Sequence, residues 1–144
     1  MSTHPKLFKN AKLVLAEDVI NGSLTVDPDG LISDIGSATE AVGHDCEGDF
    51  LLPGLIELHT DHLEVHYAPR PKVRWNPVAA VQAHDAQIAC AGITTVFDAL
   101  RVGMDEDDDS NDTMKVADMR ALADAIETGQ KENRLRADHY IHLR

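Results

Sequence analysis

The strongest constraint on the fold is an alternation of strand-like and helix-like segments through residues 54–143. The strands are predicted at 54–59, 93–100 and 137–143, and the helices at 76–92 and 112–129. Asn76 is the predicted cap of the first helix, and Gly92 and Gly129 are the predicted helix stops. Strands joined through helices by short connections form a parallel sheet covered by helices. The sequence therefore predicts an α/β fold.

A different pattern precedes this alternation. Residues 11–52 consist of short strand-like segments separated by turn formers such as Asn21-Gly22. We expect residues 1–53 to form a small β layer with little core of its own, and residues 54–144 to form the first three strand–helix units of a larger sheet. Since three parallel strands rarely bury both faces alone, we expect an incomplete fold that needs a C-terminal part or a companion chain. A complete small three-layer domain is the alternative.

Charge and composition exclude several classes of partner. The 144 residues carry a formal net charge of -12, which opposes binding to nucleic acid or to an anionic membrane. Much of the charge lies in the acidic run at 105–112, which is typical of a solvated loop. Two cysteines cannot build a disulfide framework, and no run has the length of a membrane span or the form of a signal peptide. We expect a cytoplasmic protein, with homo-oligomer formation left open.

The segment "PGLIELHTDHLEVH" at 53–66 contains the clearest candidate for a metal site. His59 and Asp61 are two residues apart at the end of the first parallel strand, so their side chains point the same way. This is the edge of the sheet at which α/β proteins keep their active sites. An imidazole and a carboxylate at this spacing can bind one divalent ion. The alternative is a His–Asp hydrogen bond that only shapes a turn.

Further candidates surround this pair in the sequence. His62 and His66 are one helical turn apart and either face a substrate cleft or lie on a polar surface. Glu64, between them, either contacts substrate or is a supporting or surface acid. His142 and Arg144 share one face at the end of the third strand, where they could contact an anionic substrate.

A basic segment follows at 69–75. Arg70, Lys72 and Arg74 alternate along a stretch that two prolines are expected to hold extended, which would place the three cations on one side. Such a row suits the phosphates of a substrate, and we assign Arg70 and Lys72 to substrate binding. Local charge balance is the alternative.

Two polar residues fall on apolar elements. His84 lies on the stripe of the first helix that faces the sheet, so it is interpreted as a hydrogen-bonded core residue. Asp98 lies near the end of the second parallel strand and is expected to point into the same site as His59 and Asp61, with a functional role left open.

Beyond these patterns, the sequence resembles a known family. A β-rich N-terminal layer, "LLPGLIELHTD" and "GITTVFDA" resemble the amidohydrolase superfamily of metal-dependent (β/α)8-barrel hydrolases. The segments "ELHTDHLEVHYAPRPKVRWNP", "AHDAQIACAGITTVFDALRVG" and "LRADHYIHLR" are similar to its branch in phosphonate metabolism, the carbon–phosphorus lyase pathway. The reaction implied by this resemblance is release of pyrophosphate from a ribosyl triphosphate.

The resemblance also implies roles for individual residues. His59 and Asp61 correspond to the first-strand metal ligands, with zinc as the expected ion and manganese or iron as alternatives. The remaining ligands and the proton-accepting Asp come from later strands, so we expect them beyond residue 144 and expect this chain to be inactive alone. C-terminal strands usually complete the β layer into a sandwich. The alternatives are a C–N bond hydrolase or deaminase of the same superfamily and a non-catalytic metal- or nucleotide-binding module.

Overall fold

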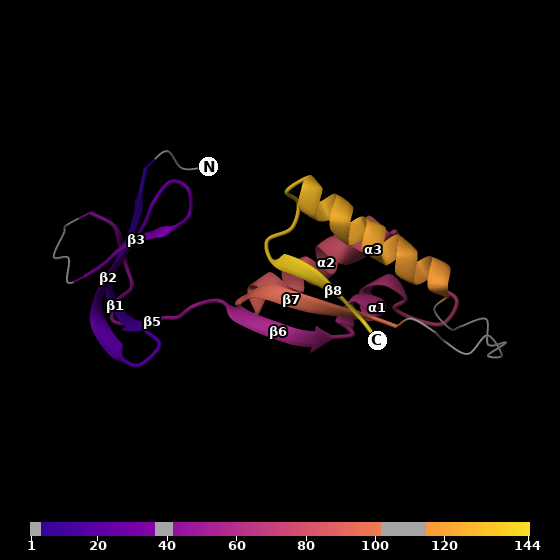
Figure 1. Ribbon diagram of the computed structural model, residues 1–144, viewed down its shortest axis with the longest axis horizontal. Coiled ribbons are helices and arrows are strands. Elements are labelled where there is room, and N and C mark those ends of the chain that lie inside the picture. Colours follow the sequence, from indigo (N-terminus) through magenta and orange to yellow (C-terminus); the bar gives the residue numbers. More distant parts are fainter. Residues whose placement is uncertain (1–3, 37–41, 102–114) are drawn as a thin grey trace. The chain divides into compact units, whose positions relative to one another are not determined.

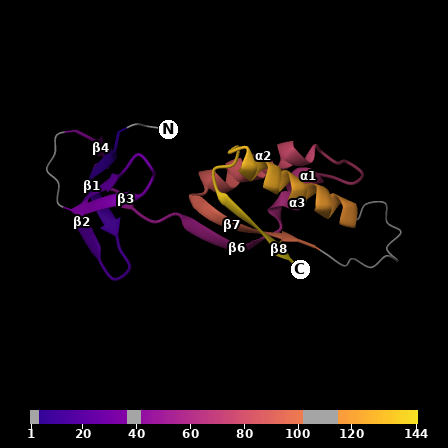
Figure 2. The ribbon, with the colours of Figure 1, turned by 45° about the horizontal axis from the view of Figure 1, so that its top comes forward.

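The computed structural model describes residues 4–36, 42–101 and 115–144. The acidic run at 105–112 and the first residues of the helix predicted at 112–129 lie outside these ranges. The chain divides into two compact units, Met1–Pro53 and Gly54–Arg144 (Figures 1 and 2). No helix within the described ranges is long and apolar enough to cross a membrane.

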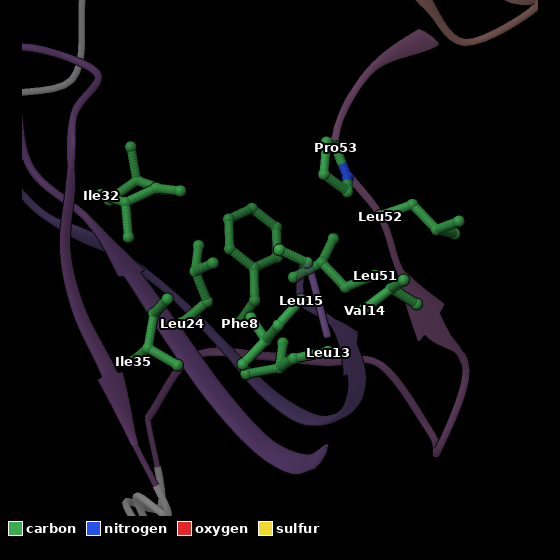
Figure 3. A pocket seen from close by; sticks show the side chains of 12 residues that line it. Phe8, Leu13, Val14, Leu15, Leu24, Ile32, Ile35, Leu51, Leu52 and Pro53 are labelled. Atoms are coloured by element: carbon green, nitrogen blue, oxygen red, sulfur yellow. The ribbon is translucent and has the colours of Figure 1, made fainter. Parts of the chain in front are cut away.

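The first unit is a small β layer. Its strands are β1 (Lys6–Val14), β2 (Val19–Val26), β3 (Ile32–Gly36), β4 (His44–Asp45) and β5 (Phe50–Leu51), in the order β3-β2-β1-β4 with β5 also paired to β1. One face gathers apolar side chains around a cavity of about 420 Å³ (Figure 3). Ile32 and Phe50 remain 60% exposed, so this layer buries little of its apolar surface.

The second unit is a parallel sheet with helices. Strands β6 (Leu55–Thr60), β7 (Ile93–Leu100) and β8 (Asp138–Leu143) lie in the order β6-β7-β8, and both pairings are parallel. The helices α1 (His62–Tyr67), α2 (Pro77–Cys90) and α3 (Val116–Lys131) lie on one side of this sheet (Figures 1 and 2). The predicted α/β arrangement is thereby confirmed.

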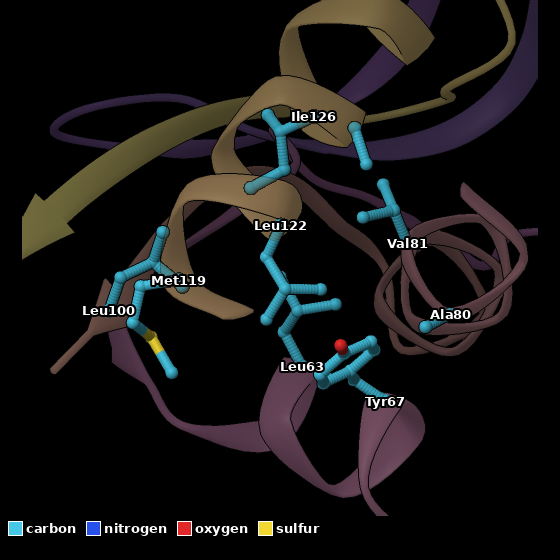
Figure 4. Close-up of a cluster of buried hydrophobic side chains, with 9 residues drawn as sticks. Leu63, Tyr67, Ala80, Val81, Leu100, Met119, Leu122 and Ile126 are labelled. Atoms are coloured by element: carbon cyan, nitrogen blue, oxygen red, sulfur yellow. The ribbon is translucent and has the colours of Figure 1, made fainter. Parts of the chain in front are cut away.

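Apolar residues between the three helices and β7 form the core of this unit (Figure 4). Leu63, Leu122 and Ile126 are at most 1% exposed, and Leu100 of β7 packs in the same cluster. The other face of the sheet is open, since Leu58 is 70% exposed and lines a hollow of about 460 Å³. Only one face of the sheet is therefore covered by the described residues.

Local signals explain where the helices begin and end. The side-chain oxygen of Asn76 accepts a hydrogen bond from the N–H of Ala79 at 3.1 Å, which confirms the predicted cap. Gly92 follows α2 with φ +77°, a conformation that favours glycine. The predicted stop at Gly129 is wrong, because α3 continues through it to Lys131. A Cβ there would lie only 3.0 Å from Leu135, so this glycine permits close packing.

Candidate metal and substrate site

His59 and Asp61 lie together at the carboxyl end of β6. The Nε2 atom of His59 is 3.9 Å from the Oδ1 atom of Asp61, and each side chain is 44% exposed. Asp61 precedes α1 but makes no side-chain capping bond to it. Its Oδ1 atom is inaccessible to solvent and has no hydrogen-bond partner. The carboxylate thus presents a free acceptor toward the imidazole.

This pair is close to the geometry that a divalent ion requires. Zinc ligands lie about 2.0–2.2 Å from the metal, so two ligands of a tetrahedral site are about 3.3–3.6 Å apart. The 3.9 Å separation of the His59 and Asp61 atoms is slightly larger, and a small rotation of either side chain would close the difference. A buried acceptor without a donor is costly, and a cation would satisfy it. The donor set, one imidazole and one carboxylate, suits zinc, manganese or iron.

Strand β8 brings two more predicted residues to the same place. The His142 ring lies edge-on to the His59 ring, with the centroids 5.0 Å apart. The Nη1 atom of Arg144 is 3.2 Å from the Oδ2 atom of Asp61. The Oδ2 atom of Asp61 is therefore paired with Arg144, while the Oδ1 atom has no hydrogen-bond partner. We call these four residues, which come from β6, β8 and the residues that follow them, the rim site: His59, Asp61, His142 and Arg144.

Helix α1 was not predicted as an element. It is only six residues long, and its turn buries Leu63 and Tyr67 on one side. The spacing of these two apolar residues was the signal available in the sequence. His66 Nε2 lies 2.9 Å from the side-chain oxygen of Gln87 in α2, whose amide nitrogen is 3.4 Å from His62 Nδ1. Both histidines therefore contact α2, and their assignment to substrate binding remains a prediction.

Glu64 adds a second acid beside Asp61. Its Oε1 atom is buried and has no hydrogen-bond partner. Burial raises the pKa of Glu64 above its ordinary value, and the negative charge of Asp61 acts in the same direction. The cations of Arg101 and Arg144 oppose this rise. Arg101 was not singled out from the sequence, although it directly follows the end of β7.

The basic segment does not form the extended row that was predicted. The backbone turns at Lys72, whose φ is +61°. The guanidinium of Arg74 lies 6.0 Å from the centre of the Tyr67 ring and 3.9 Å from an Asp118 oxygen. Arg74 therefore packs against α1 and α3 instead of joining Arg70 and Lys72. The role of Arg70 and Lys72 in phosphate binding stays a prediction.

A second polar cluster is buried under the helices. Asp98 accepts hydrogen bonds at 2.7 Å from His84 Nε2 and from His139 Nδ1, one at each carboxylate oxygen. The exposed fractions are 0%, 0% and 3% for Asp98, His84 and His139. The interpretation of His84 as a hydrogen-bonded core residue is confirmed. The expectation that Asp98 points toward the same site as His59 and Asp61 is wrong, because its carboxylate lies on the helix-covered face of the sheet and is bonded by His84 of α2.

These three residues are also of types that can hold an ion, since one ligand atom from each lies within 4.8 Å of the others. Both Asp98 oxygens, however, already accept short hydrogen bonds. Burial would raise the pKa of Asp98, but the bonds from His139 and His84 outweigh burial and lower it. The rim site, with its open oxygen, is the better candidate for a metal.

Asp85 of α2 extends this cluster toward β8. It accepts hydrogen bonds from the backbone N–H groups of Arg136 and Ala137 at 2.8 and 3.0 Å. Its Oδ1 atom also lies 3.4 Å from His139 Nε2. Burial would raise the pKa of Asp85, but these backbone bonds and the Arg136 side chain lower it overall. We call the four buried side chains the imidazole–carboxylate network: His84, Asp85, Asp98 and His139.

Comparison with known proteins agrees with this architecture. No family model matches the chain. It is 41% identical over 140 residues to the alpha-D-ribose 1-methylphosphonate 5-triphosphate diphosphatase of Escherichia coli (strain K12), and this match covers 96% of the chain and 36% of that protein. The chain thus spans about a third of its curated relative.

Solved structures give the same result. A D-hydantoinase is 26% identical with a TM-score of 0.53, over 96% of this chain and 27% of that one. The β-aspartyl dipeptidase of Fervidobacterium islandicum AW-1 is 19% identical with a TM-score of 0.53, over 98% and 33%, and shows the fold alone. The resemblance predicted from the motifs is therefore confirmed: this chain is similar, over nearly its whole length, to hydrolases of the amidohydrolase superfamily.

Proposed function

We propose that this chain forms part of a metal-dependent hydrolase in which His59 and Asp61 hold the ion. The observation that supports this best is the unpartnered Oδ1 of Asp61, 3.9 Å from His59 Nε2 at the carboxyl end of a parallel sheet. A divalent ion, when bound, supplies Lewis-acid polarisation and activates water near neutral pH. Zinc is the expected ion, with manganese and iron as alternatives.

The residues of the chain have separate tasks in this proposal. Arg144 is paired with the second oxygen of Asp61, so it orients the carboxylate and leaves the first oxygen open. His142 packs edge-on against His59 and restricts the orientation of that ring. Glu64 is close enough to Asp61 for their charges to interact, and its raised pKa suits a group that exchanges protons near the site.

The substrate class follows from the sequence relative and the cations. The E. coli relative is named as a diphosphatase of a ribosyl triphosphate. We propose that this chain takes part in the same reaction, release of pyrophosphate in phosphonate metabolism, with Arg70 and Lys72 contacting phosphates. His62 and His66 are proposed to contact the same substrate. A cytoplasmic location remains a prediction, with homo-oligomer formation left open.

The fold is proposed to be part of a larger one. Strands β6, β7 and β8 would be the first three of a closed (β/α)8 barrel, whose interior is the face that includes the 70% exposed Leu58. The β layer of residues 1–53 would be part of a composite β-sandwich. Later strands of the barrel would supply the remaining metal ligands and the proton-accepting Asp.

A chimera tests the activity. This chain would replace the matched part of the E. coli relative, so that the relative supplies the remaining strands. The chimera should release pyrophosphate from α-D-ribose 1-methylphosphonate 5-triphosphate when loaded with zinc. Asp61→Ala should abolish this release and reduce bound zinc, whereas Asp124→Ala, at an exposed helical position, should change neither. A folded chimera with Asp61→Ala that kept full zinc content would disprove the ligand assignment.

A second candidate is hydrolysis of a C–N bond in a cyclic amide. The observation that favours it is the structural match to a D-hydantoinase. The same chimera, assayed with hydantoin and with dihydroorotate, separates the two candidates. Turnover of a cyclic amide without release of pyrophosphate would establish the second candidate and would remove the proposed role of Arg70 and Lys72.

A further inference from the structure

The imidazole–carboxylate network lies on the helix-covered side of the sheet, whereas the rim site lies at its carboxyl edge. We propose that this network is a proton-dependent positioning device: an imidazolium at His139, held between two carboxylates, fixes β8 so that His142 and Arg144 reach the rim site. The positioning of β8 is independent of any metal. Its importance for ion binding rests on the proposed function.

The first argument is the surroundings of the His139 ring. Nδ1 is 2.7 Å from an Asp98 oxygen, and Nε2 is 3.4 Å from an Asp85 oxygen. A neutral imidazole has only one N–H, so its other nitrogen would direct a lone pair at a carboxylate. A ring with a carboxylate at each nitrogen is therefore favoured as the doubly protonated cation. Burial would lower the pKa of His139, but Asp98 and Asp85 outweigh burial and raise it.

The second argument is the balance of charge around His139. Asp98 faces it from β7, and Asp85 faces it from α2. His84, also from α2, approaches with a ring-centroid distance of 5.8 Å. Arg136 precedes β8 and places its Nη1 3.1 Å from Asp85. The Arg136 side chain is 66% exposed, so its charge is screened by solvent. A protonated His139 is therefore the buried cation that offsets the charge of the two buried carboxylates.

From α3, an uncharged group contacts His139: the side-chain amide of Gln130 donates to the His139 carbonyl at 2.8 Å. Three elements next to β8, namely α2, α3 and β7, therefore all contact the backbone or side chain of one residue. This makes His139 the point at which α2, α3 and β7 together hold the strand.

The third argument connects this point to the rim site. Residues on a strand alternate between faces, so His139 faces the helices while His142 and Arg144 face the other way. In the register of the sheet, His139 lies opposite Val96 of β7 and His142 opposite Ala99. A one-residue slip would reverse the faces of all these side chains. Fixing His139 on β7 therefore also fixes where His142 and Arg144 lie.

The pH dependence has a defined sign. The folded-state pKa of His139 is above its ordinary value of 6.5. Its contribution to the stability of the folded chain is therefore complete below pH 6.5 and is lost as the pH rises through the folded-state pKa. The pKa of Asp98 is below its ordinary value of 3.8, so its contribution is lost as the pH falls through the folded-state pKa. The network is intact in the window between these limits.

The direct test is nuclear magnetic resonance of the chain with ¹⁵N-labelled histidine. We expect His139 to be mostly doubly protonated at pH 6.5 and to titrate above that pH. In the same sample, the protection factor of the Arg144 amide, which donates to the Leu100 carbonyl at 3.1 Å, should fall as His139 loses its proton. Protection of Ala125 in α3 should not follow that titration. A neutral His139 at pH 6.5 or below would overturn the proposal.

The variant test uses Asp98→Asn, which keeps the shape and removes the charge. Protection of the Arg144 amide should fall about tenfold or more, while the exposed control Asp124→Asn leaves it unchanged. If Asp98→Asn does not fold, His139→Gln replaces it with the same expectation. A folded variant with unaltered protection at Arg144 would disprove the positioning role.

Zinc titration separates this proposal from the proposed function. Failure of the chimera described above to bind zinc would count against the metal site alone, because the protection factors need no metal. Zinc binding that survives Asp61→Ala but is lost in Asp98→Asn would place the ion in the buried network and overturn the positioning role.

Discussion

Replacement of Asp85 by alanine tests how the buried charges stabilise the second unit. Asp85 is 0% exposed, and its carboxylate accepts hydrogen bonds from the backbone N–H groups of Arg136 and Ala137 at 2.8 and 3.0 Å. Removing the acceptor leaves these donors unsatisfied, at about 1–3 kcal/mol for each buried group. It also removes one of the two carboxylates that face His139. We expect a total loss of about 3–5 kcal/mol in the free energy of unfolding.

The ion pair with Arg136 contributes little to this value. The Arg136 side chain is 66% exposed, and exposed ion pairs are worth about 0–1 kcal/mol. Arg136→Ala should therefore cost at most about 1 kcal/mol, although it removes the most obvious charge partner of Asp85. Urea unfolding followed by circular dichroism measures both variants against the wild-type chain. If Arg136→Ala were as destabilising as Asp85→Ala, the assignment of the energy to the backbone donors would be refuted.

Three further substitutions test local features of the fold by the same unfolding assay. Leu122→Ala empties a fully buried position in the core and should cost about 2–5 kcal/mol, and a loss below 1 kcal/mol would contradict the packing described. Asn76→Ala removes the cap of α2 and should cost about 1 kcal/mol, whereas Asn76→Asp should retain most of the stability. Gly54→Ala places a Cβ 2.2 Å from side-chain atoms of Thr94 and should be destabilising, with partial rescue by Thr94→Gly; no rescue would refute the steric cause.

The strand–helix alternation could be predicted because its signals are local. The strand expected at 93–100 is β7 to the residue, since β-branched and apolar residues fill it and Gly92 precedes it. The cap at Asn76 was equally local. Helix α1 was not predicted because six residues give too short a pattern, and its stability comes from burial of Leu63 and Tyr67 instead of from helix propensity.

The site was predictable only where the residues are close in sequence or at equivalent strand ends. His59 and Asp61 come together because a strand alternates faces, and His142 and Arg144 join them because parallel strands end at one edge. The partners of Asp98 could not be read in this way. His139 is 41 residues away from it along the chain, and nothing in the spacing shows that His84 and His139 bond the same carboxylate.

The central claim is that His59 and Asp61 bind one divalent ion. The most direct measurement is anomalous X-ray diffraction at the zinc absorption edge, on crystals of the zinc-saturated chimera with the E. coli relative. We predict a zinc peak at about 2.0–2.2 Å from both His59 Nε2 and Asp61 Oδ1. Zinc found only among His84, Asp98 and His139, or no zinc between His59 and Asp61, would contradict the claim.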